Sequence, residues 1–185
     1  MYTDAEIIMK LKKGDEVAIQ FIVEHYSHKL LRVALGICGD VQVAEEVVQD
    51  ALLLVCRRVH SFEERAALGT WLYRITVNQA KNRMRGAWIR KIVVWDEGKM
   101  NLLRAQETNE PEIVAIRCET QQEVLTSLLQ LPVKYRDVLV LYYLEDMTIA
   151  HISQILEQPE GTIKSKLARG REKLRAIIES KEVSS

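Results

Sequence analysis

The chain contains little of what usually interrupts or cross-links a backbone. Its 185 residues include only three prolines, eight glycines and three cysteines. Scarce proline and glycine disfavour a fold made of many turns, and apolar residues recur at spacings of three and four, so we expect an all-α fold. Cys38, Cys56 and Cys118 are odd in number and widely spaced, which argues against a disulfide framework or a zinc site.

Long apolar runs and enzyme-like residue sets are also missing from the sequence. The longest apolar run, Val138 to Leu144, is far shorter than the roughly 20 residues that a membrane span requires. Asp4 and Glu6 interrupt the N-terminal segment, unlike a signal peptide, so we expect a cytoplasmic protein. Because no Ser/His/Asp set, carboxylate pair or phosphate-binding glycine loop is recognisable, we expect no catalytic site, cofactor, metal or small-molecule substrate.

Net charge is zero, yet the charges are sorted into blocks. The chain has 26 basic and 26 acidic residues. Six basic residues and no acid occur between positions 74 and 91, and six more occur between 160 and 178 against two acids. Between these blocks, positions 96–123 contain seven acids against three basic residues. Two separated basic segments are typical of a protein that contacts nucleic acid at two places.

The N-terminal half predicts two helices with a well-marked junction. Apolar residues from 17 to 37, including Val17, share one helical face, and Gly39 with Asp40 ends that helix and caps the next. The second helix, 41–59, keeps a regular apolar repeat that indicates a buried face. Its other surface is polar and most often such a surface is merely solvated; the residues there are Glu45, Glu46, Gln49 and Asp50.

The first basic block is predicted to lie on a third helix. We expect a loop over 61–69, an N-cap at Thr70 and a helix from Trp71. One apolar stripe should pack inward: Tyr73, Val77, Ala80, Met84 and Trp88. A second stripe should be displayed: Arg74, Asn78, Lys81 and Arg85. Because these basic residues have no neighbouring acids, an external anion is their expected partner, with a merely solvated basic face as the alternative.

A change in pattern divides the chain into two small helical domains. Helical periodicity fades over 93–118, where acids and turn-forming residues accumulate, and we interpret this segment as a flexible linker. The expected domains are therefore 1–92 and 119–185. Helical periodicity returns in the second domain and breaks at Leu131–Pro132, where the proline suits the first turn of another helix.

The C-terminal segment predicts a helix-turn-helix. Thr148 caps a brief helix through Leu156, and Pro159 opens a longer one that runs to about Ile178. An inward stripe holds this last helix in place: Ile163, Leu167, Gly170, Leu174 and Ile177. Donors suited to base edges and phosphates occupy its remaining surface: Thr162, Lys164, Ser165, Lys166, Arg169 and Arg171. The alternative for such a basic helix is a purely structural bundle.

Three motifs in these stretches resemble the sigma factors of bacterial RNA polymerase, specifically the extracytoplasmic-function (ECF) group of the sigma-70 family. The motifs are the segment from Gly39 to Ala51, the run from Thr70 to Ile75 with Asn78, and the segment Leu131 to Arg136 together with Glu160 to Ser165. They occur in the family's order and spacing, and the resemblance covers nearly all of the chain except the linker. The resemblance implies a region 2 helical bundle at 1–92 and a region 4 helix-turn-helix at 119–185.

The resemblance also implies a partner for each surface. The acidic helix would dock on the clamp helices of the polymerase's largest subunit, through Glu45, Glu46, Gln49 and Asp50. The third helix and the loop at 61–69 would open the minus-ten promoter element, with Asn78 on a flipped base and with Arg74, Lys81 and Arg85 on phosphates. The helix-turn-helix would bind the minus-thirty-five duplex beside the polymerase flap. An anti-sigma factor, often membrane-anchored in the family, would sequester both domains.

Five positions depart from the usual family pattern. Glu157 and Gln158 stand where the turn commonly has a glycine and an aliphatic residue, which leaves the turn geometry open. His151 and Asn82 stand where members often carry an acid, and Lys166 where many carry arginine. A surface histidine is a more common role for His151 than a pH switch. None of these departures removes a motif.

We therefore interpret the chain as a promoter-specificity factor that binds core RNA polymerase and initiates transcription, of stress or envelope-response genes, and not as an enzyme. One alternative is a free-standing helix-turn-helix regulator that uses its N-terminal half to dimerise. Another is a helical scaffold whose basic faces bind acidic partners. A repressor has no need of an acidic helix followed by a basic helix with a displayed Asn, and a scaffold has no need of a helix-turn-helix.

Overall fold

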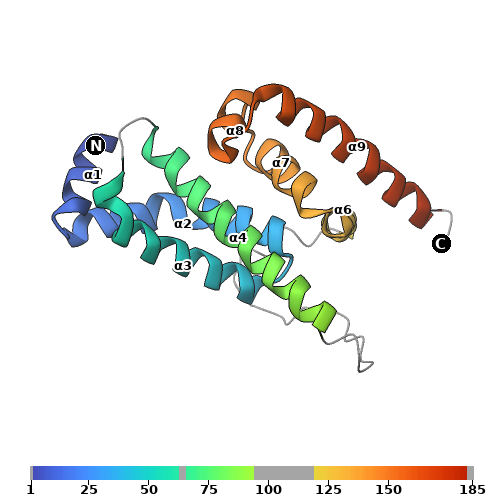
Figure 1. Ribbon diagram of the computed structural model, residues 1–185, viewed down its shortest axis with the longest axis horizontal. Coiled ribbons are helices and arrows are strands. Elements are labelled where there is room, and N and C mark those ends of the chain that lie inside the picture. The colour runs from blue at the N-terminus through green and yellow to red at the C-terminus, as the bar shows by residue number, and fades with distance from the viewer. Residues whose placement is uncertain (1, 63–65, 94–118, 183–185) are drawn as a thin grey trace.

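The computed structural model describes residues 2–62, 66–93 and 119–182, and every regular element within them is helical. The all-α prediction is confirmed. In chain order the elements are α1 (Asp4–Lys12), α2 (Glu16–Cys38), α3 (Val41–Arg58), the 3-10 turn η1 (Val59–Ser61), α4 (Leu68–Val93), α6 (Glu119–Gln130), α7 (Val133–Tyr143), α8 (Ile149–Leu156) and α9 (Glu160–Glu182). We call α1 to α4 the N-terminal bundle and α6 to α9 the C-terminal bundle (Figure 1). Apart from Val93, the expected linker lies outside the described residues.

Capping groups set the helix boundaries at the start of the N-terminal bundle. Asp15 accepts a hydrogen bond from the Val17 N–H at 3.0 Å and begins α2. Gly39 ends that helix in the left-handed conformation, with φ +78°, which glycine adopts without steric cost. Asp40 then accepts from the Val43 N–H at 2.9 Å and begins α3. The predicted junction is confirmed.

Helix α4 begins earlier than the sequence predicts. Its first residue is Leu68 rather than Trp71, and the Leu68 N–H donates to the Asp4 carboxylate at 2.9 Å. Thr70 is therefore not an N-cap; it is buried inside the first turn. Because α1 supplies the capping carboxylate from a distant part of the chain, local sequence could not reveal this start. The predicted loop is correspondingly shorter, with η1 at one end and α4 at the other.

The apolar stripes predicted for the N-terminal helices largely pack as expected. Tyr73, Val77 and Ala80 of α4 are buried, and the apolar repeat of α3 faces the same core. Val17 lies on the first turn of α2 and is 44% exposed, so the apolar face of that helix is buried only farther along. The side chain of Trp88 lies outside the described residues. Because Tyr73, Val77 and Ala80 are buried in the N-terminal bundle, the opposite side of α4 is left for contacts outside this bundle.

The predicted helix-turn-helix is confirmed. Thr148 caps α8 by accepting from the His151 N–H at 3.2 Å, and α9 begins just after Pro159. Glu157 ends α8 in the left-handed conformation, with φ 53° and ψ 46°, where glycine is most common. This residue settles the turn geometry that the sequence left open. A side chain in this conformation costs about 1–2 kcal/mol.

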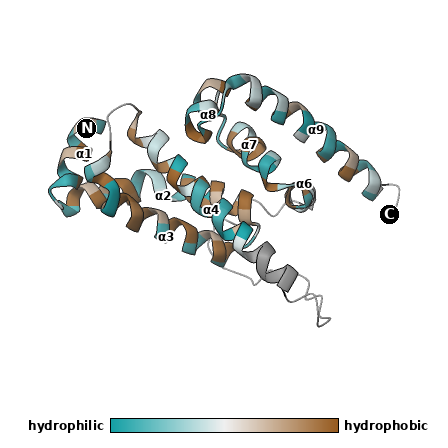
Figure 2. Cartoon of the chain, in the orientation of Figure 1, coloured by the Kyte–Doolittle hydropathy of each residue, from teal (hydrophilic) through white to brown (hydrophobic). Residues whose placement is uncertain are grey.

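Helix α9 packs on α7 through the predicted inward stripe. Ile163, Leu167 and Gly170 are buried, and the stripe continues in half-buried residues farther along the helix. A β-carbon on Gly170 would lie 3.2 Å from Cδ1 of Leu139, so the two helices approach closely at this point. The rest of α9 is mainly hydrophilic, as Figure 2 shows. A broad polar surface of α9 is therefore available to solvent.

The two bundles pack directly on each other, which the sequence did not predict. Helices α2 and α4 contact α6, α7 and α8 (Figure 1). A β-carbon on Gly36 of α2 would lie 2.9 Å from Cγ2 of Val140 and 3.1 Å from Cδ1 of Leu144. One on Gly39 would lie 2.5 Å from Cδ2 of Leu129.

Within the described ranges, no helix has the length and apolar composition to cross a membrane.

We expect Asp40→Ala to lower the free energy of unfolding by about 0.5–2 kcal/mol, because the first turn of α3 loses its side-chain acceptor. Asp40→Asn is the matched control, since its amide oxygen can accept the same hydrogen bond. Chemical denaturation followed by circular dichroism measures both changes. Equal destabilisation by Ala and by Asn would contradict the capping role.

Candidate nucleic-acid interface

The outer surface of α3 carries the predicted polar residues. Glu45, Glu46, Gln49 and Asp50 are all exposed. Arg83 of α4 pairs with Glu46, and its Nη2 atom lies 3.9 Å from Oδ2 of Asp50. Leu53 extends the same surface and is 56% exposed. We call Glu45, Glu46, Gln49, Asp50 and Leu53 the α3 face.

Sequence reasoning missed Leu53, although a signal was present. Leu53 is a large apolar residue outside the apolar repeat of α3, three residues after Asp50 and four after Gln49. On a helix this spacing places Leu53 beside both polar residues. A single exposed leucine is common on protein surfaces, so Leu53 adds one apolar side chain to this polar surface without by itself marking it as an interface.

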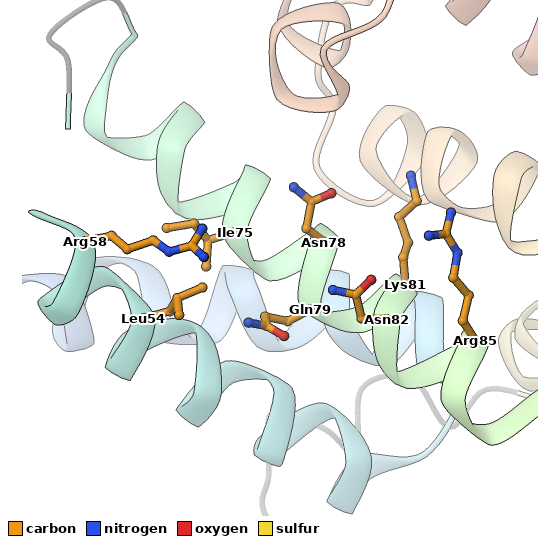
Figure 3. Close-up of a pocket in the computed structure, with 8 residues that line it drawn as sticks. All are labelled: Leu54, Arg58, Ile75, Asn78, Gln79, Lys81, Asn82 and Arg85. Carbon is orange, nitrogen blue, oxygen red and sulfur yellow. The ribbon is translucent and has the colours of Figure 1, made fainter. Parts of the chain in front are cut away.

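A groove of about 370 Å³ lies between residues of α3 and α4. Its lining is mostly cationic and amide side chains: Leu54, Arg58, Ile75, Asn78, Gln79, Lys81, Asn82 and Arg85 (Figure 3). We call it the α3–α4 groove. Amides both donate and accept hydrogen bonds, and guanidinium groups donate only, so the lining suits base edges and phosphates together. Asn78 and Arg85 are exposed here, as predicted.

The groove also contains cationic and amide residues that the sequence did not nominate. Arg58 belongs to α3 and reaches the groove from the opposite wall to Asn78. Gln79 lies on the side of α4 nearer α3, whereas Lys81 extends toward the C-terminal bundle (Figure 3). Helical spacing relates residues on one helix, so it could not bring Arg58 to a site on another.

Two of the four displayed residues predicted on α4 are paired with the C-terminal bundle. Nη1 of Arg74 lies 2.8 Å from Oε1 of Glu157, and Nη2 donates to the backbone carbonyl of Gln154 at 2.8 Å. Nζ of Lys81 donates to Oδ2 of Asp137 at 2.8 Å. The expectation that these basic residues lack acidic partners is therefore wrong. The acids are distant in sequence and become neighbours only through bundle packing.

Two carboxylates are buried between the bundles. Asp137 is 0% exposed, and its Oδ1 accepts from the Val138 N–H at 2.9 Å. The side chain of Glu145 is 3% exposed and accepts from Nε and Nη2 of Arg32, at 2.9 and 2.7 Å, and from the Tyr73 hydroxyl at 2.7 Å. Burial, together with the Glu145 hydrogen bond, raises the pKa of Tyr73. Buried carboxylates need such partners to offset the loss of hydration.

Arg136 ties the ends of two helices together. Its guanidinium group is buried and donates to the backbone carbonyls of Ile37, Leu129 and Leu131. The Ile37 carbonyl lies at the end of α2. The Leu129 carbonyl lies at the end of α6, and Leu131 follows that helix. The helix dipole favours a cation at such C-terminal ends. Burial lowers the pKa of Arg136. This arginine therefore joins the N-terminal bundle to the C-terminal bundle.

A second hollow, of about 330 Å³, lies at the start of α9. It is lined by Lys134, Tyr135, Gly161, Thr162, Ser165, Lys166 and Arg169. We call it the α9 hollow. It gathers four of the six residues predicted on this helix and adds a lysine from α7. Nζ of Lys166 donates to Oε1 of Gln158 at 2.7 Å, which holds the lysine against the turn.

The other two predicted residues of α9 lie outside this hollow. Lys164 is exposed to solvent. The guanidinium carbon of Arg171 lies 5.3 Å from the ring centre of Tyr142 and 5.5 Å from that of Tyr143. These cation–π contacts place Arg171 against the end of α7. The predicted set is thus divided between the hollow and its surroundings.

The cysteines and acids do not form a metal site in the described part of the chain. No group of three or more His, Cys, Asp or Glu residues there could hold a metal ion. The Cys38 thiol is half-buried, and burial raises its pKa to about 11. Cys56 is exposed. Cys38 therefore stays protonated and unreactive at neutral pH.

The fold and these surfaces define a helical protein with a helix-turn-helix and two hollows suited to nucleic acid. The "Sigma-70 region 2" family model matches residues 22–89, and the "Sigma-70, region 4" model matches residues 121–174. The ECF RNA polymerase sigma factor SigW of Bacillus subtilis (strain 168) is 33% identical over 173 residues, covering 91% of this chain and 92% of that protein. The chain belongs to the ECF sigma factors of the sigma-70 family.

Further comparisons agree with this assignment. The ECF RNA polymerase sigma-E factor of Escherichia coli (strain K12) is 30% identical over 181 residues, covering 92% of this chain and 91% of that protein. The solved structure of CnrH with the cytosolic domain of CnrY matches at a TM-score of 0.68 and 18% identity, over 96% and 97% of the two chains. The solved structure of the sigma factor RpoE with the anti-sigma factor NepR from Bartonella quintana matches at a TM-score of 0.64 and 21% identity. The match covers 92% of this chain and 98% of that chain. Both structures support the fold.

We expect the two described cysteines to differ strongly in reactivity. In a Cys118→Ser chain at about pH 8, a thiol-alkylating reagent should modify Cys56 rapidly and leave Cys38 unmodified, because the thiolate is the reactive form. Since the Cys38 pKa is raised to about 11, its modification should increase only as the pH approaches that value. Mass spectrometry of the labelled chain measures both rates. Equal labelling of the folded chain at the lower pH would contradict the burial of Cys38.

Proposed function

We propose that this sigma factor binds core RNA polymerase and directs it to promoters by contacting two different states of DNA. The observation that supports the proposal is the presence of two cation-lined hollows on separate bundles. One is rich in amides, and the other lies at the start of the second helix of a helix-turn-helix. In this proposal, residues 1–92 and 119–185 are separate domains joined by the linker 93–118. Catalysis belongs to the polymerase.

The α3–α4 groove suits the single-stranded minus-ten element. Bases in a melted strand expose their hydrogen-bonding edges, which the Asn78 amide can contact as both donor and acceptor. Arg58 and Arg85 supply positive charge along the groove, as single-strand channels require. Arg74 and Lys81 would contact phosphates once they are free of their acidic partners. Unstacking a base costs a few kcal/mol, which these contacts can offset.

The α9 hollow suits the minus-thirty-five duplex. Thr162 and Ser165 lie in the first turns of α9, where backbone N–H groups also attract phosphate. Lys166 and Arg169 add donors that match the acceptor atoms of guanine in the major groove. Lys164 and Arg171, outside the hollow, remain predicted DNA contacts on neighbouring surfaces of the same helix.

The α3 face is the proposed docking surface for the clamp helices of the polymerase. It combines acids with the exposed side chain of Leu53, which a partner can bury. The C-terminal bundle would lie beside the polymerase flap. The solved structures show CnrH in complex with the cytosolic domain of CnrY, and RpoE in complex with the anti-sigma factor NepR, so we propose an anti-sigma partner here too. We place this function in the cytoplasm, where polymerase and promoters are found.

A free-standing regulator is the less favoured function. Such a protein would use the helix-turn-helix alone, and the region 2 match over residues 22–89 would have no role in it. The test is transcription from a supercoiled promoter by core polymerase with and without this chain. Promoter opening that depends on the chain supports the sigma factor role. Tight DNA binding by the chain alone, with no effect on polymerase, would favour the regulator.

Asn78→Ala should impair promoter opening while leaving minus-thirty-five duplex binding nearly unchanged. A base contact of this kind is worth about 1–3 kcal/mol, so opening should fall about five- to 150-fold. Permanganate footprinting of the holoenzyme complex measures opening, and a gel-shift assay measures duplex binding. Gln20→Ala, which removes an exposed amide from α2, is the matched control. Equal loss in both assays would refute the division of labour.

Arg169→Ala should show the opposite pattern. Loss of this donor from the α9 hollow should weaken minus-thirty-five duplex binding by about 1–3 kcal/mol if the contact is to a base. Lys164→Ala tests the neighbouring surface in the same titration. Lys173→Ala, which removes an exposed cation of α9 outside the hollow, controls for net charge. The assignment fails if Lys173→Ala weakens binding as much as Arg169→Ala does.

A further inference from the structure

We propose that Tyr142 and Tyr143, the last two residues of α7, are positioning residues that hold the guanidinium group of Arg171 for a phosphate of the minus-thirty-five duplex. We call them the tyrosine pair. The pair acts through the arginine and not on the DNA. The proposal rests on the function proposed above, in which Arg171 is a predicted DNA contact outside the α9 hollow. It adds the residues that fix where this cation lies.

Two aromatic rings of α7 contact one cation of α9. The guanidinium carbon of Arg171 lies over the ring of Tyr142 at 5.3 Å and over that of Tyr143 at 5.5 Å, measured to the ring centres. The rings meet edge to face, with their centres 5.0 Å apart and their planes at 79°. This is a favoured arrangement of an aromatic pair, so each ring supports the other. The pair therefore restricts a long and otherwise flexible side chain to one place on the surface.

Arg171 stays able to bind an anion while it contacts the rings. The residue is exposed, and no described carboxylate forms an ion pair with it. Arg74 and Arg83, by contrast, are paired with acids. A planar guanidinium group that contacts ring faces keeps N–H donors along its edge, and these donors match phosphate oxygens. Because the rings carry no charge, the full positive charge of Arg171 is retained for DNA.

Helix α7 supports α9 at two edges of its outward surface. Near the start of α9, Lys134 and Tyr135 of α7 line the α9 hollow. Farther along, a β-carbon on Gly170 would lie 3.5 Å from Cβ of Tyr135, and the next residue, Arg171, contacts the tyrosine pair. One end of α7 therefore meets α9 at the hollow, and the other end meets it at Arg171.

Helical spacing aligns Arg171 with Lys164, another predicted DNA contact. The two residues are about two helical turns apart, so their side chains lie on one side of α9, with the exposed Ala168 between them. The small side chain of Ala168 leaves room for a DNA backbone along this stripe. Arg171 thus extends the cationic surface of α9 beyond its first turns.

Core packing does not account for the whole tyrosine pair. Tyr142 is half-buried and packs against the core, but Tyr143 is 53% exposed. A cation–π contact at an exposed site adds little to the stability of the fold. An arginine that is already restrained loses less conformational freedom when it binds phosphate. The effect of the pair should therefore appear in DNA affinity rather than in the free energy of unfolding.

The test is a double-mutant cycle on duplex binding by the full-length chain. Fluorescence anisotropy would follow a labelled duplex that carries the minus-thirty-five element of a promoter opened by the wild-type holoenzyme. We expect Tyr143→Leu to bind about two- to five-fold more weakly than wild type, because a ring contact with the cation is lost. Arg171→Ala should bind about ten-fold more weakly and lower the slope of log affinity against log salt by about one. Tyr143→Leu should cause no further loss when Arg171→Ala is already present.

Two control variants separate the ring from other effects. Tyr143→Phe keeps the ring and loses only the hydroxyl, so it should bind as wild type does. Tyr2→Leu removes a tyrosine of the N-terminal segment that is 45% exposed, and should leave duplex affinity unchanged. Because a phosphate contact carries no sequence information, Tyr143→Leu should also weaken binding by the same factor when one base pair of the element is changed.

Three results would each overturn the proposal: Tyr143→Leu binds as wild type does, Tyr143→Phe binds as weakly as Tyr143→Leu, or Tyr143→Leu weakens binding equally with and without Arg171. Since Tyr143 is exposed, Tyr143→Leu should fold, and circular dichroism checks this. If any of these results is found while the wild-type chain supports promoter opening, the proposed function stands. If the wild-type chain fails to support opening, the proposed function falls and this proposal with it.

Discussion

The buried ion pair between Asp137 and Lys81 is the interaction on which the arrangement of this molecule depends. A fully buried carboxylate is tolerated only beside a cation, and α4 of the other bundle supplies that cation. The pair therefore sets how the C-terminal bundle sits on the N-terminal one. The approach of Gly36 to Val140 and the contacts of Arg136 with the end of α2 complete the same interface. Together they decide which surfaces of the free chain are covered.

Basic and acidic residues that balance in the net charge of the chain also pair with each other in the structure, partly across this interface. Basic residues from the first block are neutralised by acids of the C-terminal bundle, and Arg83 by acids of the α3 face. The basic α9 hollow, by contrast, remains open to solvent. In the proposed function, the α9 hollow is therefore exposed from the start, whereas Arg74 and Lys81 contact phosphates only once they are free of their acidic partners.

Features that depend on one helix were predictable from the sequence. Periodicity located the helices from α2 onward, although α1 was not predicted, and the Gly39–Asp40 junction and the Thr148 cap follow from well-known capping preferences. Features that depend on two distant segments were not predictable. Asp4 caps α4, Arg58 lines a groove with residues of another helix, and Asp137 pairs with Lys81. In each case the partner lies many residues away, where spacing carries no information.

The most direct measurement is the distance between the bundles in the free and promoter-bound states. Spin labels at Cys56 of α3 and at a cysteine introduced by Glu172→Cys in α9, with Cys38 and Cys118 replaced by serine, report this distance through electron–electron dipolar coupling. The account predicts one narrow, short distance for the free chain and a longer one in the complex with core polymerase and promoter DNA. The same distance distribution in both states would contradict it.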